Sequence, residues 1–81
     1  MDLENITSFS VLDARGLTCP MPLLKTKKEL KGVPEGEILE IWGTDPGSKN
    51  DIPHFGAKGG NSFLGFVDDA DGYTRYFIRK G

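Results

Sequence analysis

The sequence predicts a two-layer α+β sandwich with the element order β-α-β-α-β-β, in which a four-stranded mixed sheet carries both helices on one face. Short runs of alternating apolar and polar residues, which are typical of half-buried strands, are separated by two stretches with helical spacing. Eleven glycines and five prolines among 81 residues place turns between these short elements. The Asp-Gly pair at 71–72 separates the last two strand-like runs, which predicts an antiparallel hairpin.

The first predicted strand covers residues 9–14, and its alternation places Leu12 and Ala14 on one face. After the turn that follows, a predicted helix opens at residues 18–20 and runs to about Lys31. The lysines of this helix are expected to face solvent. Its apolar stripe is expected to comprise Leu23, Leu24 and Leu30, with the stem of Lys27.

The remaining predicted elements are a strand at 37–42, a helix at 48–58 and two strands at 62–68 and 73–79. Ser48, followed three residues later by Asp51, resembles a capping box at the start of the second helix. Pro53 is late for a first helical turn, so a start nearer Ile52 is the alternative. Because a β-α-β crossover is right-handed, the first two strands are expected to be parallel, with the first helix on one face.

Composition limits what such a chain can do. Eighty-one residues suffice for one small domain, which buries about 60% of the surface that its unfolded form exposes. We expect a flexible N-terminal segment at residues 1–8 and a single domain at residues 9–81. The formal net charge of -2 is not that of a generic nucleic-acid binder, so direct nucleic-acid binding is not expected.

Cysteine and histidine each occur once, which excludes an internal disulfide and a structural zinc site with four such ligands. We therefore expect no metal and no cofactor. The first residues have neither the basic nor the apolar region of a signal peptide, and no apolar run approaches the roughly 20 residues of a membrane span. Together with the unpaired thiol, these features predict a cytoplasmic protein without membrane contact.

Cys19, the single thiol, lies in the segment that enters the first predicted helix. Unpaired N–H groups and the positive end of the helix dipole lower the pKa of a cysteine at such a position. Pro20 suits the first helical position and Pro22 still lies in the first turn, so the two rings stiffen the backbone beside the sulfur. Arg15 adds positive charge if the loop folds back. The alternative is that Cys19 is a small buried hydrophobe.

Several short motifs occur in a fixed order along the chain. They are Leu12-Asp13, Gly16-Leu17, Cys19-Pro20-Met21-Pro22, Gly36-Glu37, Thr44-Asp45-Pro46, Asp51-Ile52-Pro53 and the closing Tyr76-Phe77-Ile78-Arg79-Lys80. With these motifs the chain resembles the TusA/SirA-like sulfur-carrier family from about Val11 to Lys80. One departure is that Asn61 follows Gly60, where many members have Gly-His; the effect of this change is open.

The resemblance implies the β-α-β-α-β-β sandwich and a sulfur-carrying persulfide on Cys19. It also implies a cysteine desulfurase or a rhodanese-like protein as sulfur donor, and a downstream acceptor protein in tRNA thiolation or other sulfur metabolism. No residue resembles a general base for breaking C–S bonds, which favours a sulfurtransferase-type carrier that acts with partner enzymes. The groups expected to shape the site are Pro20, Pro22, Asp13, Gly16, Arg15 and Asp45, the last of which is also expected to cap the second helix.

The roles of two surfaces and of the single histidine have more than one interpretation. Lys25 and Lys28 lie close to the thiol in sequence, either as a solvated helix face or as a docking patch for an acidic partner. His54 is expected to be a surface or packing residue. The sheet face without helices is expected to carry Trp42, Phe77, Ile38, Arg75 and Arg79, which suggests the alternative of a non-enzymatic regulatory, RNA-binding or protein-binding module. A redox sensor would need a resolving thiol from another chain.

Overall fold

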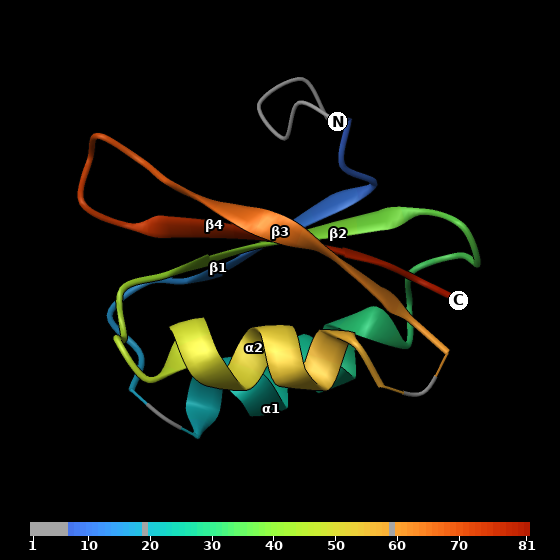
Figure 1. The fold of residues 1–81 in the computed structure, drawn as a ribbon, viewed down its shortest axis with the longest axis horizontal. Helices are drawn as coiled ribbons and strands as arrows, with labels where there is room; N and C mark the ends of the chain where they lie inside the picture. The colour runs from blue at the N-terminus through green and yellow to red at the C-terminus, as the bar shows by residue number, and fades with distance from the viewer. Residues whose placement is uncertain (1–6, 19, 59) are drawn as a thin grey trace.

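The computed structural model describes residues 7–18, 20–58 and 60–81, and it confirms the predicted fold class. In chain order the elements are β1 (Ser10–Ala14), α1 (Met21–Leu30), β2 (Ile38–Gly43), α2 (Ser48–Gly56), β3 (Ser62–Asp68) and β4 (Thr74–Arg79). The four strands form one layer, and both helices cover the same face of that layer (Figure 1).

The strand order in the sheet is β1-β2-β4-β3. β1 is parallel to β2, as the right-handed crossover rule predicts, and β4 pairs antiparallel with both β2 and β3. The predicted hairpin joins β3 to β4, where the Asp69 N–H donates to the Tyr73 carbonyl at 2.8 Å. The last strand in chain order therefore lies inside the sheet, between the second strand and the third.

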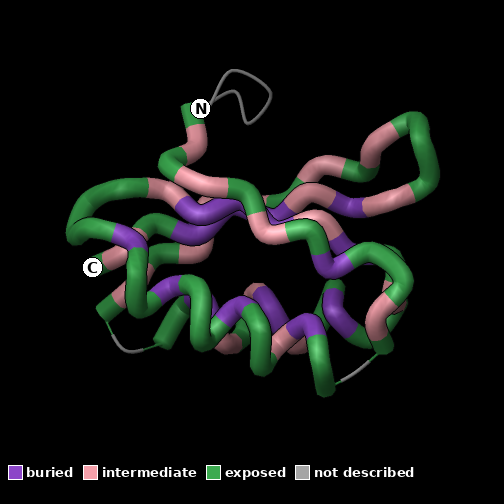
Figure 2. Tube along the Cα trace, turned by 180° about the vertical axis from the view of Figure 1, so that it is seen from behind, coloured by how far each residue is buried: buried purple, intermediate pink, exposed green. Residues whose placement is uncertain are grey.

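The core lies between the sheet and the helices, where the buried segments gather (Figure 2). Alternation along β2 turns Leu39 and Ile41 toward the helices, as predicted, and both are fully buried. Tyr76 and Ile78 do the same on β4. Ala14 at the end of β1, Leu30 and Ile52 of the two helices, and Val33 after α1 complete this cluster.

The buried face of α1 differs from the predicted leucine stripe. It consists of Pro22, Thr26 and Leu30, whereas Leu24 is 51% exposed, so the prediction for Leu24 is wrong. Thr26 can be buried because its hydroxyl donates to the carbonyl of Pro22 at 2.7 Å, which satisfies the polar group within the helix. Since Leu24 is two residues from Pro22, about 200° around the helix, it points away from the core.

α2 begins at Ser48, so the alternative start near Ile52 is wrong, and Pro53 lies inside the helix. Its N-cap is Gly47 rather than Ser48, so the predicted capping box is wrong as well. The Ser48 hydroxyl donates instead to the carboxylate of Asp45 at 3.4 Å, and the Ser48 N–H donates to the Asp45 backbone carbonyl at 3.1 Å. Among the described residues no side chain caps α2, which corrects the expected capping role of Asp45.

The face of the sheet away from the helices carries a buried carboxylate. The register pairs Trp42 with Arg75 and Ile38 with Arg79 on this face, as predicted, and pairs Glu40 with Phe77. Glu40 is only 6% exposed, and Phe77 opposite it is fully buried.

Three donors from different parts of the chain satisfy Glu40. They are the Ser8 hydroxyl at 2.8 Å, the Arg75 Nε at 3.0 Å and the indole Nε1 of Trp42. Burial alone raises the pKa of Glu40, but these hydrogen bonds and the charge of Arg75 outweigh burial and hold its pKa below the ordinary value. The carboxylate is therefore charged in the folded protein at neutral pH.

We predict that Glu40→Gln lowers the free energy of unfolding at pH 7 by about 2–3 kcal/mol, because buried donors then face a neutral amide. A depressed folded-state pKa means that this stabilisation is present above the ordinary value of 4.5 and is lost as the pH falls through the folded-state pKa. Urea unfolding across a pH series measures both effects, and the variant should lose part of the acid dependence. Glu37→Gln, at an exposed position of the same segment, is the control; equal losses in the two variants would contradict the assignment.

Candidate functional site: the thiol loop

The segment that joins β1 to α1, residues 15–20, is called the thiol loop here because it contains Cys19. It starts at the carboxyl end of β1, beside the carboxyl end of the parallel strand β2. Cys19 itself lies outside the described residues, so its expected exposure and reactivity stay predictions. Its neighbours on both sides are described, and they fix the path of the backbone toward and away from it.

The first half of the loop is fastened to the sheet and to the core. Gly16 has a φ of 82°, which lies in the left-handed region, and it reverses the chain after β1. Its N–H donates to the hydroxyl of Thr44, which follows β2, at 2.9 Å. The Leu17 N–H then donates to the Ala14 carbonyl at 3.2 Å, and the Leu17 side chain packs against the core.

The second half of the loop forms the start of α1. Pro20 is the N-cap of α1 rather than its first helical residue, which was the prediction. Pro22 lies in the first turn, as predicted. The Thr18 carbonyl accepts from the Met21 N–H at 2.9 Å, and the Pro20 carbonyl accepts from the Leu24 N–H at 3.0 Å. Residue 19 therefore directly precedes the helix N-cap. The first turn carries no acidic side chain, so no carboxylate within it offsets the positive end of the helix dipole.

Arg15 and Asp13 form an ion pair at the base of the loop. The Arg15 Nε and Nη2 atoms each lie 2.8 Å from a different carboxylate oxygen of Asp13. Side-chain hydrogen bonds from Arg15, with its backbone N–H and charge, lower the pKa of Asp13 to about 2. The same guanidinium lies 4.9 Å from the ring centre of Trp42 and 5.0 Å from that of Tyr73. The expected charge effect of Arg15 on the thiol stays a prediction.

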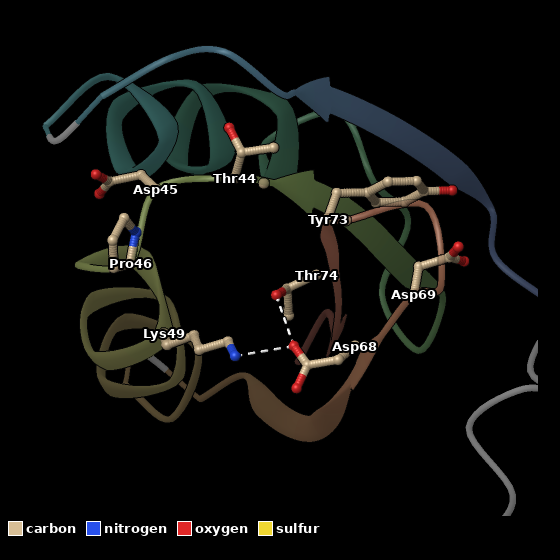
Figure 3. Close-up of a pocket in the computed structure, with 10 residues that line it drawn as sticks. Thr44, Asp45, Pro46, Lys49, Asp68, Asp69, Tyr73 and Thr74 are labelled. Carbon is tan, nitrogen blue, oxygen red and sulfur yellow. Dashed lines mark hydrogen bonds and ion pairs between the residues drawn. The ribbon is translucent and has the colours of Figure 1, made fainter.

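A pocket of about 330 Å³ opens beside the loop, and Thr44 and Asp45 form part of its wall. Lys49 points from α2 across the pocket toward Asp68 of β3, with Nζ 2.9 Å from the carboxylate (Figure 3). Thr74 donates to the same Asp68 oxygen at 2.9 Å. Asp45 adjoins Thr44 in the chain, and it is Thr44 whose hydroxyl accepts from the Gly16 N–H of the thiol loop.

The exposed side of α1 combines apolar and basic groups. Met21 and Leu24 are 43% and 51% exposed, and Lys25 and Lys28 are exposed beside them. Their positions follow the i, i+3, i+4, i+7 spacing of a single helix face. We call these four residues the α1 face. Sequence reasoning identified its lysines and missed its two apolar side chains, although the spacing was the signal that could have found them.

Two other predicted positions lie away from the loop. His54 is exposed, as expected, and lies in a groove of about 360 Å³ between the helices, whose wall also includes Leu23 and Phe55. Asn61 lines a smaller pocket beside Leu30, at the opposite end of α1 from the thiol loop, and its carboxamide oxygen accepts from the Gly81 N–H at 3.0 Å. The departure at Asn61 is therefore a change at the far end of α1.

Within residues 7–18, 20–58 and 60–81, no group of three or more metal-ligating side chains converges on one point. No helix in the described part of the chain is long and apolar enough to cross a membrane.

Comparison with known proteins assigns the family. The model of the family described as "Sulfurtransferase TusA" matches residues 10–80. This chain belongs to the TusA family of sulfur carrier proteins. Within that family, "Putative sulfur carrier protein YrkI" of Bacillus subtilis is 43% identical over 74 residues, which cover 91% of this chain and 97% of that protein. "Sulfur carrier protein TusA" of Allochromatium vinosum is 38% identical over 69 residues, covering 85% and 90% of the two chains.

The fold is shared with a solved crystal structure. A SirA-like protein from Desulfitobacterium hafniense matches with a TM-score of 0.78 at 20% identity, over 89% of this chain and 97% of that chain. The sandwich of a four-stranded sheet and two helices is thus shared with that protein.

We predict that Gly16→Ala lowers the free energy of unfolding by about 1–2 kcal/mol, because a Cβ disfavours the left-handed conformation although it would meet no atom within 4 Å. Gly32→Ala is the matched control. Gly32 is also exposed, its backbone is not left-handed, and its Cβ would have an ordinary contact of 3.6 Å. Urea denaturation measures the free energy of unfolding of both variants, and we expect the smaller loss in Gly32→Ala. A loss in Gly16→Ala no larger than that in Gly32→Ala would argue against a rigid chain reversal at Gly16.

Proposed function

We propose that this TusA-family protein carries sulfane sulfur as a persulfide on Cys19 and relays it between partner proteins. The observation that carries the proposal is the position of the single thiol, directly before the N-cap of a helix whose start is stiffened by Pro20 and Pro22. Such a position favours the thiolate, which is the nucleophile in sulfur exchange. The membership of the chain in a family of sulfur carriers supports the same function.

The transfer needs only sulfur exchange. The Cys19 thiolate attacks the terminal sulfur of a donor persulfide, the S–S bond of the donor breaks, and the donor leaves as a thiolate. The terminal sulfur is then bound to Cys19, and attack by a nucleophile of the acceptor repeats the exchange in the other direction. No oxidant or reductant is consumed, so partner enzymes supply the chemistry that generates and finally uses the sulfur.

Six neighbours are proposed to shape the site, and the described contacts suggest how each could act. Pro20 and Pro22 stiffen the start of α1, and Gly16 reverses the chain before the thiol. Asp13 and Arg15 form an ion pair at the base of the loop. Asp45 follows Thr44, whose hydroxyl accepts from the Gly16 N–H of the loop.

The α1 face is the proposed docking surface for those partners. It begins two residues after Cys19 and presents two apolar side chains beside two lysines. A partner surface with an apolar centre and carboxylates around it would complement this pattern and would be steered toward it. A cysteine desulfurase or a rhodanese-like protein is the proposed donor, and a downstream sulfur acceptor is the second partner. A cytoplasmic location, which keeps the thiol reduced, completes the proposal.

The alternative of an RNA-binding module draws less support from the contacts of the open sheet face. The Trp42 ring, which is the largest aromatic surface on that face, lies beneath the guanidinium of Arg15. Two of the three arginines on that face are paired, Arg15 with Asp13 and Arg75 with Glu40, whereas Arg79 is exposed. The two ion pairs and the covered indole leave fewer groups for phosphate binding and base stacking.

We predict that incubation with a cysteine desulfurase and L-cysteine adds the mass of one sulfur atom to the protein, and that dithiothreitol removes it. Cys19→Ser should gain no such mass, because the chain contains no other cysteine. Intact-mass spectrometry measures both proteins. A wild-type protein that gains no reducible sulfur from this donor or from a rhodanese-like donor, or a Cys19→Ser variant that still gains it, would refute the carrier role.

We predict that the double variant Lys25→Glu/Lys28→Glu slows association with the donor by about tenfold or more at low salt, because it reverses the charge of the α1 face. Stopped-flow association across a salt series measures the effect. Arg79→Glu is the control, since Arg79 is an exposed cation on the other side of the sheet. Arg79→Glu changes the net charge by two units and the double variant by four, so an Arg79→Glu effect of half the size or more on a logarithmic scale would indicate an effect of net charge and would exclude the α1 face as the docking surface.

A further inference from the structure

Arg15 is held on three sides. Its Nε and Nη2 atoms bind both oxygens of Asp13, and the Asp13 carboxylate also accepts from the Arg15 backbone N–H at 3.1 Å. Its guanidinium lies over the rings of Trp42 and Tyr73, whose centres are 5.2 Å apart. We call these four residues the clasp. A guanidinium suits such a site because its planar fork binds a carboxylate with two atoms while its face stacks on rings.

The residues of the clasp come from separate parts of the sheet. Trp42 comes from β2, and its indole N–H is fixed by Glu40, which also binds Arg75 of β4 and Ser8. Tyr73 is the residue immediately before β4, which begins at Thr74. The guanidinium is therefore held between Asp13 of β1 and two rings supplied by β2 and by the residue before β4, all of them outside the loop to which Arg15 belongs.

The clasp lies on the face of the sheet opposite the helices, whereas the loop leads to a helix. Asp13 is paired with Trp42 in the sheet register, so the guanidinium it binds stays on the open face. The chain reverses at Gly16, one residue after Arg15, and the side chain of Leu17 then packs into the core on the helix side. The loop thus crosses from one face of the sheet to the other between two anchors, only two residues before Cys19.

We propose that Arg15 is a positioning residue for sulfur transfer, and that it acts through the clasp, which fixes the path of the thiol loop, rather than through its positive charge. The charge of Arg15 is already balanced by the Asp13 carboxylate that binds it with two atoms. The inference rests on the proposed sulfur-carrier function, because it assigns a residue to the same transfer.

Two conservative variants separate the two roles. Arg15→Lys keeps the charge but loses the fork and the stacking, whereas Asp13→Asn keeps the arginine but loses half of the ion pair. If Arg15 acted by charge, Arg15→Lys would behave like the wild type, and Asp13→Asn would expose the arginine charge and lower the thiol pKa. If Arg15 acts through the clasp, both variants lose function together. Arg79→Lys, an exposed arginine on the same sheet face, is the control.

The first readout needs no sulfur chemistry. Amide hydrogen exchange at Gly16 and Leu17 should become about tenfold faster in both variants, while exchange in β2 and β4 stays as in the wild type. The reason is that Arg15→Lys loses the two-atom ion pair and the stacking on the rings, and Asp13→Asn loses the ion pair that holds the guanidinium over them. The pH profile of Cys19 alkylation by iodoacetamide should stay unchanged. Unchanged exchange at Gly16 and Leu17, or an alkylation profile shifted to lower pH in Asp13→Asn, overturns the proposal.

The second readout is the transfer itself. At saturating cysteine desulfurase, the rate at which Cys19 gains sulfur should fall about three- to tenfold in Arg15→Lys and Asp13→Asn and should not change in Arg79→Lys. A wild-type rate in Arg15→Lys overturns the positioning role. Failure of the wild-type protein to gain sulfur would count against the proposed function with this donor, while the exchange and alkylation measurements would still decide whether the clasp controls the loop.

Discussion

The carboxylate of Glu40 is the interaction on which the open face of the sheet depends. It accepts hydrogen bonds from Ser8 before β1, from Trp42 on β2 and from Arg75 on β4. A buried charge without such partners is strongly destabilising, so the folded state keeps all three donors in fixed positions. Trp42 in turn lies beneath Arg15, which begins the thiol loop. The geometry at the entrance of the site is thus connected to a carboxylate in the middle of the sheet.

The two sides of the molecule differ in the groups that they expose. On the sheet side, Arg15 and Arg75 are paired with carboxylates, and the Trp42 ring lies beneath the Arg15 guanidinium. The helix side leaves Met21 and Leu24 exposed next to Lys25 and Lys28, and the proposed docking surface rests on this combination of apolar and basic groups. Docking on α1, as proposed, would leave the supports of the thiol loop on the sheet side undisturbed.

The sequence predicts those parts of the fold that depend on local residue patterns better than those that depend on particular contacts. Period-two alternation was sufficient to place Leu39 and Ile41 in the core, because a strand has only two faces. The apolar stripe of α1 was mispredicted since Thr26 became a core residue by bonding to the Pro22 carbonyl, and a pattern of hydrophobicity does not show such a bond.

The candidate site was also predictable only where local sequence determines it. The position of Cys19 just before a helix follows from the prolines that flank it in the sequence. The partners of Arg15 do not, because Trp42 and Tyr73 are brought to it only by the pairing of β1 with β2 and of β2 with β4. The exposure of Leu24 likewise depends on which helix face the sheet covers.

The place of β4 within the sheet also bears on how the chain is made. Strands β1 and β2 can pair as soon as both have left the ribosome, but β3 contacts neither of them through the ladder, because β4 lies between β2 and β3. The sheet therefore closes only after the last strand in chain order has been synthesised, and the half-built domain exposes one edge of β2 until then. Until β4 pairs with it, that edge of β2 is open to pairing with another chain, so the strand order makes the incomplete domain prone to association.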